Sequence, residues 1–183
     1  MGGVAAVRRL VVGGVIFAAG CATTPEGTRA GRHREDQSRA EAILAKLTDG
    51  MNARALRVRV SDGRTVGAYS WPDGNIELTG RLVARLEDDE LAAALAHELG
   101  HLLGGQGVAR SAGSALSGGR SADAVEARAD SVATQLLARA GYPPDAMART
   151  LTKVMRAPGI TAPCRARLAN RISLLAAPGT GPH

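Results

Sequence analysis

The stretch LAAALAHELGHLLGG, residues 91–105, sets two histidines and a glutamate in a run of alanine and leucine. That composition is typical of a buried helix, where an unpaired imidazole would lose the hydrogen bonds that water provides. On a helix, His97 and His101 lie one turn apart on the same face. Two imidazoles in this arrangement can bind a single Zn²⁺, and Glu98 on the adjacent face can reach a water held on that ion. The motif therefore predicts one Zn²⁺ per chain.

A catalytic zinc ion takes three protein ligands and leaves one coordination position open. The next predicted helix offers Glu126 as the third ligand, in the segment EARAD. Asp130 follows one turn later, where its carboxylate can accept the N–H of a liganding imidazole and orient the ring. Asp123, at the start of the same helix, is a competing third ligand. On its own, an acidic pair of this spacing is more typical of a solvated helix face.

Hydrophobic periodicity and turn residues predict short strands among longer helices. A helix is predicted at 35–50. The segment 81–103 is also helical, with a break near Glu87 and a main helix over 88–103. The other predicted elements are strands at 56–61, 65–71 and 75–80, a Gly/Ser-rich loop at 104–121, and helices at 122–141, 143–157 and 164–177. The predicted fold class is α+β, mostly α.

The first 21 residues have the pattern of an export signal: two arginines, a short apolar run, and small residues leading into Cys21. The run is well below the roughly 20 apolar residues that a membrane-spanning helix needs. The small residues before the cysteine resemble a bacterial lipobox, which predicts a lipid on Cys21. Ordinary cleavage and a retained anchor are the alternatives. We expect residues 22–34 to form a flexible tether and residues 179–183 to form a tail.

The cysteine count agrees with lipidation of Cys21. The only other cysteine is Cys164, which then has no intramolecular disulfide partner. A disulfide between the two is the alternative, because an exported chain permits one. Ala22 follows the first cysteine where aspartate would be an inner-membrane signal, and by analogy with Gram-negative lipoproteins this favours the outer membrane. The predicted location is the cell envelope, lipid-anchored on the periplasmic side.

The formal net charge is +6 and the sequence pI is about 10.3. A basic chain of this kind invites a nucleic-acid partner. The arginines, however, are scattered along the whole chain and form no stripe. Aromatic residues make up only 2% of the chain, which leaves few rings on which bases would stack. We therefore expect no nucleic-acid partner.

Residues 74–105, GNIELTGRLVARLEDDELAAALAHELGHLLGG, and the EARAD segment after them resemble the metallopeptidase family that includes HtpX and the CAAX prenyl endopeptidases. The resemblance covers about residues 40–175. It implies a zincin-like peptidase domain, here at 35–178, with a small β-element beside the active-site helix. It also implies a set of site residues, namely the catalytic carboxylate Glu98 and the zinc ligands His97, His101 and Glu126.

The sequence departs from this family near its C-terminal end. Family members often carry a THPxxxxRI segment whose histidine and arginine lie near the active site, and the nearest stretch here is TAPCRARLANRI, residues 161–172. Ala162 stands where that histidine would be. Arg167 or Arg171 can supply the arginine, and we take Arg171 as the predicted donor to the oxyanion of the transition state.

These observations predict a zinc-dependent endopeptidase of the bacterial cell envelope that cleaves misfolded or envelope proteins, with Glu98 as general base. The substrate backbone is expected to pair with the strand at 75–79, or that strand simply packs against the helix. The alternative function is a catalytically weak, zinc-binding lipoprotein that binds envelope proteins in the manner of a chaperone. Whether the loop at 104–121 covers the site is left open.

Overall fold

The computed structural model describes residues 26–53, 55–63, 65–104 and 119–176. The elements are α1 (Glu26–Leu47), β1 (Arg57–Ser61), β2 (Ala68–Ser70), β3 (Asn75–Thr79), α2 (Gly80–Val83), α3 (Asp88–Leu103), α4 (Gly119–Arg139), α5 (Ala146–Met155) and α6 (Ala162–Ala176). A small sheet among six helices confirms the predicted α+β, mostly α class. Within the described residues, no helix is both long and apolar enough to cross a bilayer.

Several predictions concern residues outside the described ranges. They are the export signal with its lipidation site Cys21, most of the loop at 104–121, and the tail at 179–183. The domain limits of 35–178 also stay a prediction. Cys164 is partly buried and has no disulfide partner among the described residues.

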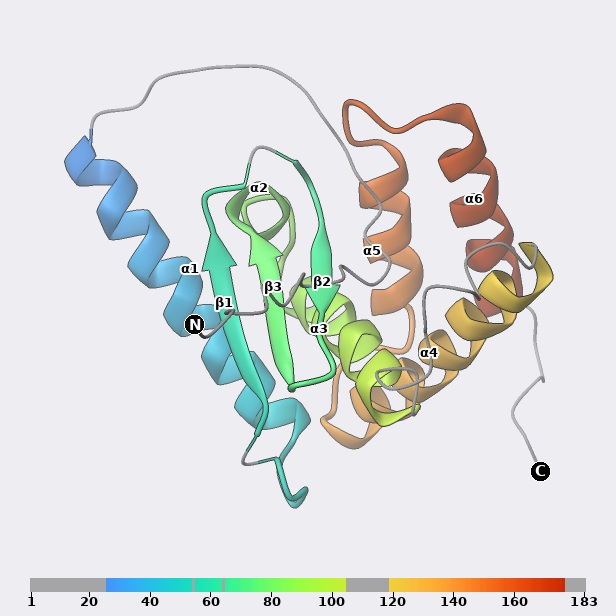
Figure 1. Ribbon diagram of the computed structural model, residues 1–183, viewed down its shortest axis with the longest axis horizontal. Coiled ribbons are helices and arrows are strands. Elements are labelled where there is room, and N and C mark those ends of the chain that lie inside the picture. Colours follow the sequence, from blue (N-terminus) through green and yellow to red (C-terminus); the bar gives the residue numbers. More distant parts are fainter. Residues whose placement is uncertain (1–25, 54, 64, 105–118, 177–183) are drawn as a thin grey trace, which may run out of the picture.

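The sheet has the strand order β1-β3-β2, with β1 parallel and β2 antiparallel to β3. Figure 1 shows α1 lying along β1 at one side of the sheet and α5 beyond β2 at the other. Because β3 pairs with a strand on both sides, it has no free edge for a substrate backbone. The prediction that a substrate pairs with residues 75–79 is therefore wrong. The local sequence pattern could not reveal this, because strand order depends on pairing between distant segments.

Helix α3 begins and ends where the sequence predicts. Glu87 caps it, and the Glu87 backbone N–H donates to Glu90 Oε2 at 2.8 Å, while the Glu87 side chain accepts from the third helical residue. The acidic residues of the first turn suit the positive end of the helix dipole. The three leucines at 91, 95 and 99 are fully buried and pack in the core. These contacts fix the helix that carries both histidines.

Helix α1 begins at Glu26, earlier than the predicted start at residue 35. Most of the segment predicted as a flexible tether is therefore helical. Apart from two glycines, residues 26–34 are compatible with a helix, and α1 lies against β1. The Gln37 amide holds the two together, since it donates to the Val58 carbonyl at 2.9 Å and accepts the Val60 N–H at 2.7 Å.

Helix α5 is fastened to the start of α3. The Thr150 hydroxyl donates to the Glu90 carbonyl at 2.9 Å, and Lys153 Nζ lies 2.6 Å from the buried Glu90 carboxylate. Arg149 also pairs with Asp89. These polar contacts hold α5 beside α3, the helix that carries the histidines. The position of α5 near the histidines is therefore a fixed part of the fold.

Candidate metal centre

The site forms where α3 and α4 touch. A Cβ at Gly100 would lie 2.5 Å from the Ala129 carbonyl oxygen and 2.9 Å from its Cα, so the two backbones are in direct contact. Only glycine permits this approach. Gly100 lies between His97 and His101, and the contact therefore brings both imidazoles to the face of α4 that carries Glu126.

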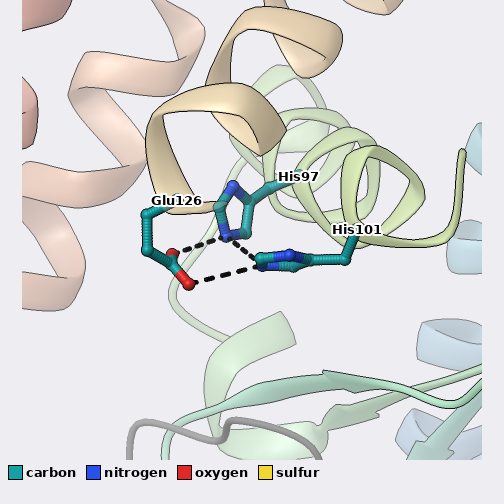
Figure 2. Close-up of side chains that lie close together, drawn as sticks. All are labelled: His97, His101 and Glu126. Atoms are coloured by element: carbon teal, nitrogen blue, oxygen red, sulfur yellow. Dashed lines mark hydrogen bonds and ion pairs between the residues drawn. The ribbon is translucent and has the colours of Figure 1, made fainter. Parts of the chain in front are cut away.

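Figure 2 shows the three side chains converging. His97 Nε2 lies 3.1 Å from His101 Nε2 and 3.2 Å from Glu126 Oε2, and His101 Nε2 lies 3.6 Å from Glu126 Oε1. All three ligand atoms lie within 4.8 Å of one another. Donors placed about 2.0–2.1 Å from a tetrahedral Zn²⁺ are separated by about 3.3 Å. Two imidazole nitrogens and one carboxylate oxygen at these spacings fit a zinc ion.

Asp130 lies on the other side of the His97 ring. Its Oδ1 is 2.9 Å from His97 Nδ1, which leaves Nε2 for the shared centre of the cluster. The hydrogen bonds from His97 and Arg171 outweigh burial and lower the pKa of the Asp130 carboxyl. An ionised carboxylate in this position fixes both the orientation and the tautomer of a liganding imidazole. This is the contact that the sequence predicts for Asp130.

Arg171 reaches the cluster from α6. It donates to both Asp130 oxygens, from Nε at 2.8 Å and from one terminal nitrogen at 2.6 Å, and its other terminal nitrogen lies 3.0 Å from Glu126 Oε2. A guanidinium that bridges two carboxylates in this way fixes their relative positions. The sequence analysis allowed Arg167 or Arg171 and took Arg171, and the structure brings Arg171 to the site while Arg167 is exposed.

The charges of the cluster favour a bound cation. Although burial opposes it, the hydrogen bonds that His97 donates to Asp130 and Glu126 raise the pKa of His97 to about 9. Burial and then the neighbouring His97 charge lower the pKa of His101 to about 4. Burial raises the pKa of Glu126, but the His97 hydrogen bond and the nearby positive charges lower it overall. Without a metal the carboxylates thus retain a proton on His97, and a metal cation would take the place of that proton.

The family model of peptidase family M48 matches residues 34–119. Over these residues the chain is similar to that family. The match runs from the middle of α1 through α3 and so includes both histidines, whereas Glu126, Asp130 and Arg171 lie beyond its end. A search of curated proteins found no match.

The match to family M48 confirms the resemblance to the metallopeptidases and supports a metallopeptidase function in general. Peptidases of the family depend on zinc, and the cluster of His97, His101 and Glu126 is able to hold a metal ion. The role of each ligand stays a prediction, and the geometry described above supports it. The competing ligand Asp123 is exposed and is not part of the cluster.

Glu98 is buried beside the cluster, with 8% of its surface exposed. Burial is the main reason that the pKa of its carboxyl is raised. The Ser70 hydroxyl, at the end of β2, donates to Glu98 Oε2 at 2.7 Å. The sequence analysis missed Ser70. No local sequence pattern indicates that a serine at the end of a short strand contacts a residue on a distant helix.

Proposed function

We propose that the chain is a zinc-dependent endopeptidase in which Glu98 acts as the general base. The observation that carries this proposal is the cluster of His97, His101 and Glu126 with a buried carboxylate at its edge. A zinc ion bound there would lower the pKa of a water molecule and polarise the carbonyl of the peptide bond to be cleaved. The proton transfers of the reaction would be carried out by side chains of the protein.

Glu98 suits proton transfer for two reasons. Its pKa is raised by burial, which brings it closer to the pH at which a carboxylate can both take and return a proton. The hydrogen bond from Ser70 holds one carboxylate oxygen in place. In the proposed reaction Glu98 takes a proton from the attacking water and passes it to the nitrogen of the leaving amine.

The contacts of Arg171 bear on its predicted role as an oxyanion donor. Three of its N–H groups point to the carboxylates of Asp130 and Glu126. This arrangement favours a positioning role, in which Arg171 holds the carboxylate ligand and the carboxylate behind His97 at a set distance. We therefore propose that Arg171 orders the metal ligands, and we no longer favour a direct contact with the oxyanion.

The edge of β2 is the better place for a substrate backbone. Within the part of the chain that the structure describes, β2 pairs only with β3. Gly67, which precedes this strand, and Ala68, which begins it, line the same cavity as His97 and Glu98. An extended peptide added to this edge would pair backbone to backbone and pass beside the cluster. We propose this position in place of the predicted pairing with β3.

The envelope location is also a proposal. It is supported by the export signal and the lipobox-like residues before Cys21. A lipid at that position would tether the peptidase to a membrane surface, on the periplasmic side, where misfolded envelope proteins are its proposed substrates. The mass of the mature N-terminal peptide tests this directly, because an unlipidated peptide or an intact leader contradicts it.

The decisive experiment replaces Glu98 with glutamine. The variant Glu98→Gln keeps the size of the side chain but cannot accept a proton, and we expect cleavage of unfolded casein to fall by about 10²- to 10⁴-fold. Zinc content should stay at one ion per chain in the variant, whereas His101→Ala should lose the ion. Casein left intact by the zinc-loaded natural protein would overturn the proposal.

One observation favours the alternative, a weakly catalytic zinc protein that binds envelope proteins. Ala162 occupies the place of the histidine that related peptidases carry near the active site, and it lies exposed at the start of α6. The same experiment separates the two functions. Zinc-loaded protein that binds unfolded casein but does not cleave it, with no difference between the natural chain and Glu98→Gln, supports the binding function.

A further inference from the structure

The backbone of β2 divides its hydrogen-bonding groups between two sides. On the side of β3, the Gly67 carbonyl accepts the Thr79 N–H at 3.0 Å. Farther along, the Trp71 N–H donates to the Asn75 carbonyl at 2.9 Å. Hydrogen-bonded and non-hydrogen-bonded positions alternate along an antiparallel pair, so Ser70 is a non-hydrogen-bonded position. Its own N–H and C=O therefore face away from β3, toward the edge proposed for the substrate backbone.

The side chain of Ser70 points in another direction, toward α3. Its hydroxyl donates to Glu98 Oε2 at 2.7 Å, and the two residues are buried, with exposed fractions of 9% and 8%. This hydrogen bond holds one oxygen of the carboxylate and leaves Oε1 as the oxygen that can meet a water at the metal position. The contact thus determines which way the proposed general base is turned.

The hydroxyl of Ser70 acts from behind Glu98. Glu98 lines the cavity at the metal centre together with Gly67 and Ala68, whereas Ser70 is not among the described residues that line it. A substrate in the cavity would therefore touch Glu98 and not the Ser70 hydroxyl. Any effect of this hydroxyl on the reaction must pass through Glu98, which makes Ser70 a positioning residue.

The strand that carries Ser70 is short. It has three residues and, within the part of the chain that the structure describes, it pairs with β3 alone. A second strand added to its free edge would supply further backbone hydrogen bonds and restrict its motion. Because the added bonds would include the backbone of Ser70 itself, they would also restrict the hydroxyl that holds Glu98.

We infer that Ser70 couples the binding of a substrate backbone along β2 to the orientation of Glu98. The backbone of Ser70 pairs with the substrate, and its hydroxyl then holds the general base in the orientation that the reaction needs. The inference rests on the proposed peptidase function and adds a substrate class to it. Extended polypeptides long enough to pair along β2 are activated for cleavage, and short peptides are not.

The first part of the test compares two blocked peptides from one segment of casein, a tetrapeptide and an octapeptide with the same four central residues. The zinc-loaded natural protein should cleave both at the same bond, with a kcat for the octapeptide at least about tenfold above that of the tetrapeptide. Mass spectrometry of the products identifies the bond. A longer peptide that only lowered KM, with kcat unchanged, would overturn the inference.

Two variants of the same shape isolate the hydroxyl. Ser70→Thr keeps it and Ser70→Val replaces it with a methyl group, and both new residues suit a strand. On the octapeptide, the kcat of Ser70→Val should fall by about 10- to 100-fold, as expected for the loss of a hydrogen bond to a charged group. Its KM should stay within about twofold, because the backbone still pairs. Ser70→Thr should keep kcat within about threefold of the natural protein.

Three controls accompany this pair. Ser70→Ala adds no volume, should match Ser70→Val, and decides the test if a branched side chain prevents folding. Ser38→Ala changes an exposed serine of α1, and its kcat and KM should match those of the natural protein. Zinc content and thermal unfolding show whether each variant is folded.

Equal kcat values for Ser70→Thr and Ser70→Val would overturn the inference while the peptidase function stands. A length effect on kcat as large in Ser70→Val as in the natural protein would do the same. If the zinc-loaded natural protein cleaves neither casein nor the peptides, the peptidase function fails, and a crystal structure with the octapeptide decides the inference. A peptide backbone bonded to Ser70, with the Ser70 hydroxyl on Glu98, supports the coupling. An octapeptide that binds elsewhere or not at all, or a Glu98 side chain turned away from Ser70, overturns it.

Discussion

At the scale of single residues, the metal centre depends on side chains that do not touch the metal position. The support that Asp130 gives to His97 is the clearest case. Its Nε2 atom faces His101 and Glu126, while its Nδ1 atom lies against the Asp130 carboxylate. An imidazole must be neutral and correctly turned to bind zinc, and the carboxylate behind the ring supplies that orientation. Asp130 therefore matters to metal affinity although it is not a predicted ligand.

This gives a prediction with a matched control on the same helix. Asp130→Asn removes the charge that orients His97, and we expect zinc affinity to fall by about 10- to 100-fold in competition with a chelator. Asp123→Asn, an exposed change on α4, should leave the affinity unaltered. If Asp123→Asn weakens binding more than Asp130→Asn does, the competing ligand is the correct one and the present assignment is wrong.

At the scale of elements, the site depends on the contact between α3 and α4. The two helices meet at Gly100, where the added Cβ would collide with the backbone of Ala129. Gly100 therefore sets how near Glu126 comes to the two histidines. The sequence motif alone describes spacing along one helix, whereas this contact sets the distance between helices.

Substitution of this glycine tests the contact. In Gly100→Ala the helices must move apart, and we expect a loss of about 1–3 kcal/mol in the free energy of unfolding together with weaker zinc binding. Gly31→Ala on α1 is the control, because a Cβ there meets nothing within 4 Å and alanine favours a helix. Thermal unfolding and chelator competition measure both effects. A Gly100→Ala protein as stable as Gly31→Ala, with full zinc affinity, contradicts the role of the contact.

Prediction from sequence works best where the signal is local. The limits of α3 and the break before it follow from apolar spacing and an acidic cap, and the structure agrees with them. The order of the strands, the contact of Ser70 with Glu98, and the contacts of Arg171 with Asp130 and Glu126 depend on segments far apart in the chain. Nothing in a local pattern reveals such pairings. The N-terminal part of α1 was missed for another reason, since polar composition alone does not exclude a helix that packs on a sheet.

At the scale of the whole molecule, the centre joins three helices that are distant in sequence. The histidines lie on α3, Glu126 and Asp130 on α4, and Arg171 on α6. In the absence of a cation, ion pairs among these groups hold the helices together. A metal ion would add a bond from α3 to α4 at a point where the backbones already touch. Because an unfolded chain has no such site, binding energy at this point acts as folding energy.

Metal removal should therefore lower the stability of the whole fold. At a free zinc concentration 100-fold above the dissociation constant, binding stabilises the folded state by about 2.7 kcal/mol. For a chain of this size each kcal/mol shifts Tm by about 2–4 °C, so a chelator should lower Tm by about 5–11 °C, and added zinc should restore it. His101→Ala removes one ligand and should show no zinc-dependent change in Tm. If zinc changed the Tm of His101→Ala as much as that of the natural protein, the stabilising metal would lie elsewhere. Loss of a ligand from this cluster would then have no effect on the stability that zinc binding adds.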